Sequence, residues 1–133
     1  MRIVFMGTPA FAAIILDQLV QAYDVVGVFT QPDAVRSRGK KLEPSPVKQT
    51  ALSHEIPVFE YATFKDNDAF DQLEGLAPDV ICVAAYGVLL SKEVIDLPPY
   101  GCLNVHGSLL PCWRGAAPIE RAILANDAEV GVC

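Results

Sequence analysis

The sequence lacks the features that mark membrane, secreted and metal-binding proteins. No apolar run reaches the roughly 18 residues that a membrane-spanning helix needs. The N-terminal apolar stretch meets Asp17 and has neither the basic region nor the cleavage site of a signal peptide. The four cysteines form no C-x-x-C pair and have no histidine cluster beside them, so no zinc or other metal site and no disulfide framework is indicated. These absences predict a cytoplasmic protein that contacts no membrane.

The composition of intrinsically disordered proteins is absent as well. Apolar residues make up 52% of the 133 residues and charged residues 20%, with no internal repeat and no low-complexity segment. A chain of this length buries about two thirds of its unfolded surface. One globular core is therefore expected.

Positive charge is scarce outside one short stretch. The net charge is −6, but residues 36–48, RSRGKKLEPSPVK, hold five basic residues and one acidic residue. This stretch carries +4, which leaves −10 for the other residues. A basic run alone is usually a solvated surface, whereas in an acidic domain it also suits contacts with nucleic-acid phosphates.

Buried strands alternate with helices along the chain. Strands are predicted over residues 1–7, 24–33, 79–87 and 101–108, and helices over 10–23, 45–56, 69–77, 91–97 and 116–127. The alternation predicts an α/β fold with a doubly wound, mostly parallel sheet. Residues 129–133 are expected to begin one more β segment, so the sheet is expected to be incomplete at the C-terminus.

No function is predicted for Gly7 or His54, although glycine turns and histidines often belong to functional sites. Gly7, in GTPAF, ends a strand before a helix, but the second and third glycines of G-x-G-x-x-G are missing, which argues against dinucleotide binding. His54 lies near the end of an ordinary predicted helix.

The strongest candidate site is the segment NVHGSLLPCWRGAAP at 104–118. Ligands of open parallel sheets bind beyond the carboxyl ends of the strands, where Asn104 and His106 lie. Side chains two apart on a strand share a face, so these two are expected to point into one space. An amide can hydrogen-bond an oxyanion and an imidazole can transfer a proton near neutral pH, which favours acyl transfer over a histidine satisfied in the core.

These residues carry a family resemblance. The chain resembles the N-terminal domain of methionyl-tRNA formyltransferases in NVHGSLLPCWRGAAPI, GTPAF at 7–11, VVGVFTQPD at 25–33, RGKKLEPSPVK at 38–48 and AYGVLL at 85–90. The N-x-H-x-S-L-L-P pattern alone specifies only the wider family of 10-formyltetrahydrofolate-dependent formyltransferases, whose acceptors include glycinamide ribonucleotide and an amino sugar nucleotide. The basic segment narrows the resemblance to the tRNA-acting members.

The resemblance implies a Rossmann-like formyltransferase fold and a reaction. The formyl group of 10-formyltetrahydrofolate, a co-substrate, would pass to the α-amino group of methionyl initiator tRNA for translation initiation. Asn104 would bind the formyl oxygen, and His106 would support the oxyanion and the proton transfers. Further residues would bind folate: Ser108, Leu109, Leu110 and Pro111 as one wall, and Ala85, Tyr86, Gly87, Val88 and Leu89 as another wall, around the pterin.

The resemblance also implies how tRNA is held and how the domains are arranged. The residues expected to contact the tRNA are Arg36, Arg38, Lys40 and Lys41, and Trp113 and Arg114 are expected to orient the acceptor. Cys112 replaces a basic residue usual in the family, which puts a phosphate contact at that position in doubt. Residues 1–133 would be an incomplete N-terminal domain that lacks the C-terminal tRNA-binding domain, and the full-length protein would be a monomer.

The family's catalytic aspartate belongs to a segment beyond residue 133, and Asp127 is not expected to replace it. The 133-residue chain alone is therefore predicted to be nearly inactive. Two alternatives stay open: a formyltransferase with a different acceptor, or a non-catalytic folate- or RNA-binding remnant.

Overall fold

The structure is a computed structural model that describes residues 1–35 and 41–133. Its helices and strands follow in the order β1 Arg2–Gly7, α1 Ala10–Ala22, β2 Asp24–Thr30, α2 Pro46–Ser53, β3 Val58–Glu60, α3 Asn67–Gly75, β4 Val80–Ala84, α4 Lys92–Asp96, β5 Cys102–Asn104 and α5 Pro118–Leu124. In this described part, no helix is both long and apolar enough to cross a membrane.

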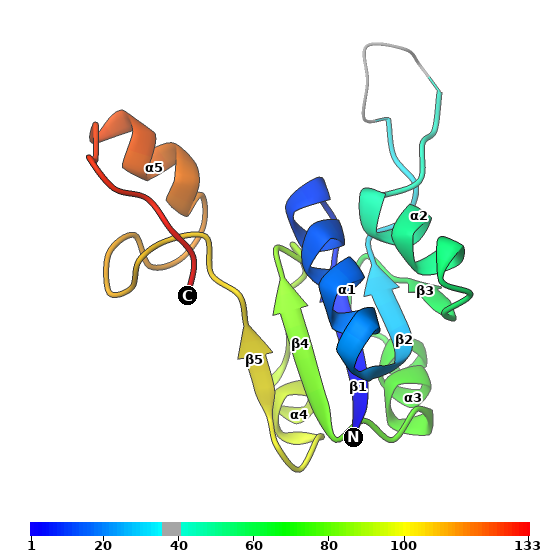
Figure 1. The fold of residues 1–133 in the computed structure, drawn as a ribbon. Helices are drawn as coiled ribbons and strands as arrows, with labels where there is room; N and C mark the ends of the chain where they lie inside the picture. Colours follow the sequence, from blue (N-terminus) through cyan, green and yellow to red (C-terminus); the bar gives the residue numbers. More distant parts are fainter. Residues whose placement is uncertain (36–40) are drawn as a thin grey trace. The chain divides into compact units, whose positions relative to one another are not determined.

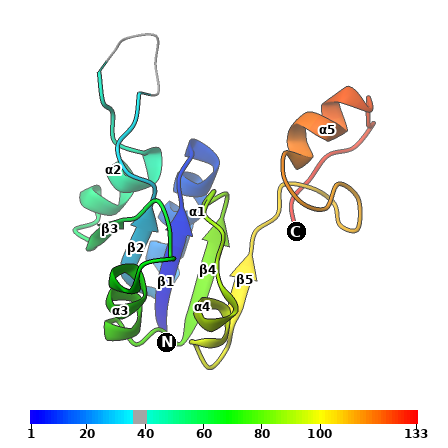
Figure 2. The same ribbon diagram turned by 180° about the vertical axis from the view of Figure 1, so that it is seen from behind.

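The strands form one parallel sheet in the order β3-β2-β1-β4-β5 (Figure 1). The chain starts in the centre with β1, builds outward to β3, then crosses back and adds β4 and β5 on the other side. Helices α1 and α2 cover one face of the sheet, and α3 and α4 cover the other, as the two opposite views show (Figure 2). The doubly wound α/β fold predicted from the sequence is confirmed.

The sheet is buried because its strands are apolar on both faces. Residues 3–7 of β1 are all buried, as are the last four residues of β2. Val4, Met6, Phe29 and Ile81 form one continuous core cluster, and none of them is exposed to solvent. Such burial contributes about 1.5–3 kcal/mol for each large apolar side chain.

Local signals set the helix starts. Ser45 caps α2 by accepting a hydrogen bond from the Lys48 amide at 3.0 Å, and Pro46 occupies the first turn, where its missing N–H costs nothing. Ser91 caps α4 in the same way through the Val94 amide.

Several details differ from the sequence prediction. The strands predicted over residues 24–33 and 79–87 end earlier, at Thr30 and Ala84. The sequence analysis missed β3, a three-residue edge strand after Pro57 that is too short to show a pattern. The strand predicted over residues 101–108 ends at Asn104. Residues 129–133 form no strand, but Cys133 exchanges two backbone hydrogen bonds with His106, at 2.7 and 3.0 Å.

The chain divides into two compact units. The sheet unit, Met1–Leu103, contains the parallel sheet up to the start of β5 and the first four helices. The C-terminal unit, Asn104–Cys133, consists of turns around α5 and is tied together by the pairing of His106 with Cys133.

Candidate functional site

Asn104 and His106 both belong to the C-terminal unit, but only Asn104 lies in a strand. The argument that the two side chains share a face of one strand is therefore wrong, because β5 ends at Asn104 and His106 follows in irregular backbone. Asn104 is exposed, and its amide makes no hydrogen bond within the described residues. It is therefore available to a ligand.

The imidazole of His106 is held on both sides. Its Nδ1 lies 2.9 Å from the Ser108 hydroxyl, and its Nε2 lies 3.2 Å from the carbonyl oxygen of Gly115. A carbonyl only accepts, so Nε2 carries a proton whenever this bond is made. The buried Ser108 hydroxyl donates its one proton to the Cys112 carbonyl at 2.7 Å, so its oxygen is the acceptor at Nδ1.

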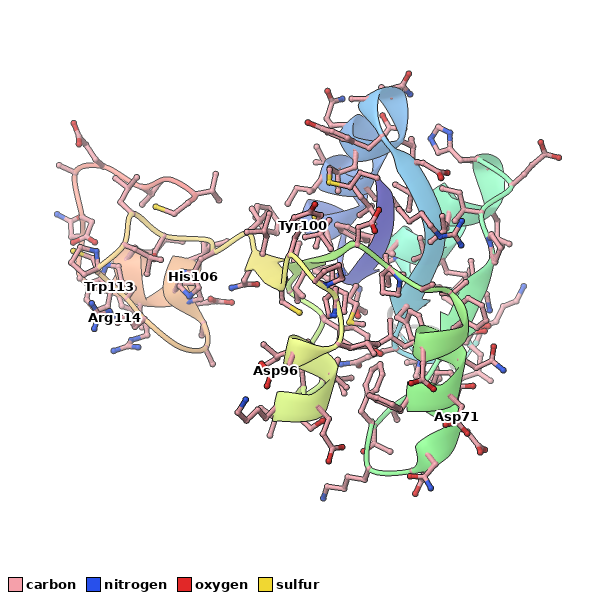
Figure 3. The ribbon with its side chains drawn as sticks, turned by 90° about the horizontal axis from the view of Figure 1, so that it is seen from below. Asp71, Asp96, Tyr100, His106, Trp113 and Arg114 are labelled. Atoms are coloured by element: carbon pink, nitrogen blue, oxygen red, sulfur yellow. The ribbon has the colours of Figure 1, made fainter. Side chains whose placement is uncertain are left out.

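Helix α5 holds the turn that contains Gly115. Arg121 donates to the carbonyl of Arg114 at 3.1 Å, and its guanidinium lies over the Trp113 ring, 5.2 Å from the centroid. The Trp113 indole N–H donates to the Asp127 carboxylate. Figure 3 shows Trp113 and Arg114 side by side in the C-terminal unit, with His106 near them. Asp127 thus helps to hold this turn through the Trp113 indole.

A cavity of about 410 Å³ opens inside the C-terminal unit. Residues expected to bind folate or the acceptor contribute to its wall, namely Ser108, Leu109 and Trp113. The rest of the wall comes from Gly107, Cys112, Ala122 and residues 127–131. Leu110 and Pro111 are exposed on the same loop. A mostly apolar hollow beside an imidazole is a suitable place for an organic ring and a reacting carbonyl.

The second predicted folate wall, residues 85–89, lies in the sheet unit directly after β4. Tyr86 is buried, and burial raises the pKa of its hydroxyl above the ordinary value. Leu89 is 95% exposed and is therefore accessible to a ligand. Val88 is half-buried, and Ala85 and Gly87 are exposed.

The basic segment is described only in part. Arg36, Arg38 and Lys40 lie outside the described residues, and Lys41 is exposed. Ala34 and Glu43, which flank the residues that are not described, exchange backbone hydrogen bonds at 3.0 and 3.2 Å. The described residues on either side of 36–40 are therefore close together.

Lys48, which contributed to the local positive charge in the sequence analysis, is engaged within the protein. Its Nζ lies 2.8 Å from Asp33 and 2.9 Å from Glu60, at the carboxyl ends of β2 and β3. The hydrogen bonds to Asp33 and then Glu60 raise the pKa of Lys48. The charge of Lys48 is therefore largely neutralised within the protein, whereas Lys41 is exposed to solvent.

The two features left without a function have structural explanations. His54 caps α2 and pairs through Nε2 with Asp17 of α1, at 2.8 Å. Gly7 is required by packing, because a Cβ there would lie 2.7 Å from the Ala12 Cβ and 2.8 Å from the Ala84 carbonyl. In the described part of the chain, His, Cys, Asp and Glu side chains form no group of three suited to a metal ion.

The sequence analysis missed two groups of polar residues. Arg121 of α5 escaped notice because a helical arginine is ordinarily a surface residue. Thr8 and Gln31, which follow β1 and β2, were given no role. The available signal was their position directly after a buried strand, where ligands of parallel sheets bind.

Comparison with known proteins places the chain in a family. The family model described as "Formyl transferase" matches residues 1–133. A methionyl-tRNA formyltransferase of Marinobacter nauticus is 59% identical over 133 residues, which cover 99% of this chain and 43% of that protein. The corresponding protein of Idiomarina loihiensis is 58% identical over 134 residues, covering 100% of this chain and 42% of its own length. The chain thus spans less than half the length of these relatives.

The fold is also found in solved structures. The phosphoribosylglycinamide formyltransferase of Bacillus halodurans superimposes with a TM-score of 0.71 at 25% sequence identity, over 99% of this chain and 69% of that one. The architecture is therefore shared beyond the close relatives.

Proposed function

Since the chain belongs to the formyl transferase family, we propose that it transfers a formyl group from 10-formyltetrahydrofolate to the α-amino group of methionine esterified to initiator tRNA. The observation that carries this proposal is the identity of 58–59% with methionyl-tRNA formyltransferases along nearly the whole chain. Residues 1–133 act as the formyltransferase domain of a cytoplasmic, monomeric enzyme that links one-carbon metabolism to translation initiation.

The reaction requires that the negative charge developing on the formyl oxygen be stabilised and that one proton be transferred. The amine nitrogen attacks the formyl carbon, the bond from that carbon to N10 of the folate breaks, and the proton lost by the amine ends on N10. The free amide of Asn104 donates to the formyl oxygen as negative charge develops there. His106 supports that oxyanion and moves the proton, and its ring is oriented by Ser108 and Gly115.

The proposal keeps both groups of residues expected to bind folate, each described within its own unit. In the C-terminal unit, Ser108 and Leu109 line the cavity, and Leu110 and Pro111 are exposed on the same loop. In the sheet unit, residues 85–89 present the exposed Leu89 and the half-buried Val88 to the pterin. The chemistry needs no metal ion.

The acceptor is recognised by charge and shape. Arg36, Arg38, Lys40 and the exposed Lys41 contact phosphates near the acceptor end of the tRNA, which gives affinity without base information. Trp113 and Arg114 lie on the turn that also holds His106, which suits a role in orienting the methionyl end.

Glycinamide ribonucleotide is the second candidate acceptor, because the fold is shared with phosphoribosylglycinamide formyltransferases. Sequence identity to the structure compared here is 25%, less than half of that to the methionyl-tRNA formyltransferases. A small ribonucleotide also does not explain the four basic residues between positions 36 and 41.

The direct test is an acceptor competition with the full-length protein. Radiolabelled 10-formyltetrahydrofolate is supplied with methionyl initiator tRNA, glycinamide ribonucleotide or an amino sugar nucleotide. Label is expected on the tRNA alone. Transfer to either small acceptor without transfer to tRNA would identify a different member of the family, and transfer to none would support a non-catalytic role.

A further inference from the structure

The residue after each of three strands contacts one residue of the loop that follows β4. Thr8 follows β1 and donates its hydroxyl to the carbonyl oxygen of Tyr86 at 2.9 Å. Gln31 follows β2 and donates its side-chain amide to the same oxygen at 3.2 Å. Tyr61 follows β3, and its carbonyl accepts from the Tyr86 hydroxyl at 3.4 Å. The carboxyl edge of the sheet thus converges on Tyr86.

The arrangement leaves the Tyr86 carbonyl with no capacity for a ligand. A carbonyl oxygen has two lone pairs, and Thr8 and Gln31 each use one of them. Thr8 is 7% exposed and Tyr86 is 2% exposed, so water cannot readily replace the Thr8 donor. The Tyr86 ring is also packed edge-on against Phe64, with centroids 6.3 Å apart.

The backbone around Tyr86 needs this support. Ala85 has φ of 45° and Gly87 has φ of 78°, so both neighbours of Tyr86 are left-handed, a conformation that a residue with a side chain adopts at a cost. A Cβ at position 87 would lie only 2.4 Å from the Gln31 Nε2. The Gln31 amide therefore packs directly against the Gly87 backbone, and the two residues together define the turn.

We infer that Thr8 and Gln31 are positioning residues for the formyl donor, because they set the conformation of the 85–89 loop before the donor binds. Neither residue touches the folate; both act through the Tyr86 carbonyl. The inference rests on the proposed function, in which this loop forms a wall of the pterin pocket. A preorganised loop binds more tightly because its ordering cost is met during folding rather than during binding.

The test uses isosteric variants with a matched control. Thr8→Val removes the donor and keeps the volume, whereas Thr8→Ser keeps the donor. Thr30→Val is the control, because the Thr30 hydroxyl is buried at the end of β2 but bonds Ser45, at 2.6 Å, rather than the loop. The full-length protein is titrated with tetrahydrofolate, and steady-state kinetics are measured with 10-formyltetrahydrofolate.

We expect Thr8→Val to raise the Kd for tetrahydrofolate and the KM for the donor roughly five- to tenfold, which corresponds to the loss of about one hydrogen bond. The value of kcat should change less than about threefold, since the lost interaction supports binding rather than the transition state. Thr8→Ser should restore binding. Gln31→Met should weaken binding in the same direction as Thr8→Val.

Thr30→Val should bind tetrahydrofolate like the wild type even where its stability falls as much as that of Thr8→Val. Equal effects of Thr8→Val and Thr30→Val, or unchanged binding by Thr8→Val, would overturn the inference and leave the proposed function intact. Failure of the wild-type protein to bind tetrahydrofolate would instead overturn the proposed function, and this inference with it.

Discussion

The Nδ1 atom of His106 faces the hydroxyl oxygen of Ser108 at 2.9 Å, and that hydroxyl is fixed in turn by the Cys112 carbonyl. Ser108 is thereby buried behind the imidazole, where it controls the orientation of the ring. The short spacing of these two residues in the loop is therefore a structural requirement as well as a sequence pattern.

Ser108→Ala is expected to lower the turnover number by about tenfold, because an unrestrained imidazole spends less time in the productive orientation. The Kd for tetrahydrofolate should change by less than about threefold, since the alanine methyl group replaces the serine methylene and keeps the apolar surface of the loop. Rapid-quench formylation and a folate titration separate the two effects. A large change in Kd with unchanged turnover would show that the hydroxyl serves folate rather than His106.

Two lysines of the basic segment should differ in their effect on tRNA. Lys41→Met removes an exposed charge, whereas Lys48→Met removes an equal charge that Asp33 and Glu60 already neutralise. Lys41→Met should weaken tRNA binding and reduce the slope of log affinity against log salt by about one, as expected for one lost phosphate contact. Lys48→Met should change neither clearly. Equal effects of both substitutions would mean that only the net charge matters.

Gly7→Ala should destabilise the protein by about 1–3 kcal/mol, because the new methyl group overlaps the Ala12 side chain and the Ala84 carbonyl. Gly75, the last residue of α3, is the matched control, since a Cβ there meets no atom within 4 Å. Gly75→Ala should stabilise by about 0.5 kcal/mol through lower backbone entropy in the unfolded chain. Urea unfolding measures both. A neutral Gly7→Ala would contradict the close approach of β1 to α1.

Stability should fall in alkali, in part through Tyr86. Burial raises the pKa of Tyr86 in the folded protein, so its contribution is complete below the unfolded pKa of about 10. Above that pH the unfolded tyrosine loses its proton while the folded one keeps it, and stability drops by up to about 1.4 kcal/mol per pH unit. The free energy of unfolding of Tyr86→Phe should therefore decrease less steeply between pH 9.5 and 11.

The control for this pH effect is Tyr100→Phe, because Tyr100 is 73% exposed. This variant should follow the wild-type curve. If Tyr86→Phe also followed the wild-type curve, the buried hydroxyl would not be the group that couples stability to pH.

The sequence was sufficient for the sheet because its central strands are long and apolar throughout. Runs such as IVFMG and VICVA bury both faces, and Ser45 with Pro46 marks a helix start without reference to the rest of the fold. Prediction failed where tertiary contacts override local pattern. Strand β3 has three residues, which is too short for an alternating apolar pattern to be recognised. Strand β5 ends at Asn104, although the alternation of apolar and polar residues continues beyond it.

The candidate site was predictable in its residues but not in its contacts. Asn104 and His106 stand out because polar side chains at a strand end have no place in a core. That the His106 ring would be held by the carbonyl of Gly115, or that Thr8 and Gln31 would meet on Tyr86, depends on how turns far apart in sequence fold against one another. No periodicity carries that information.

The central claim is that Asn104 and His106 act on the transition state of formyl transfer. It is tested most directly by single-turnover formylation of methionyl initiator tRNA by the full-length protein and by Asn104→Ala and His106→Ala, with thermal unfolding of each variant as the control. Both variants are predicted to react about 10²–10⁴ times more slowly than the wild type, because interactions that are stronger in the transition state are lost. The unfolding temperature should be unchanged for Asn104→Ala, and His106→Ala should stay folded at the assay temperature although it loses the contacts of its ring with Ser108 and Gly115. A rate within about threefold of the wild type for either variant would contradict the account for that residue.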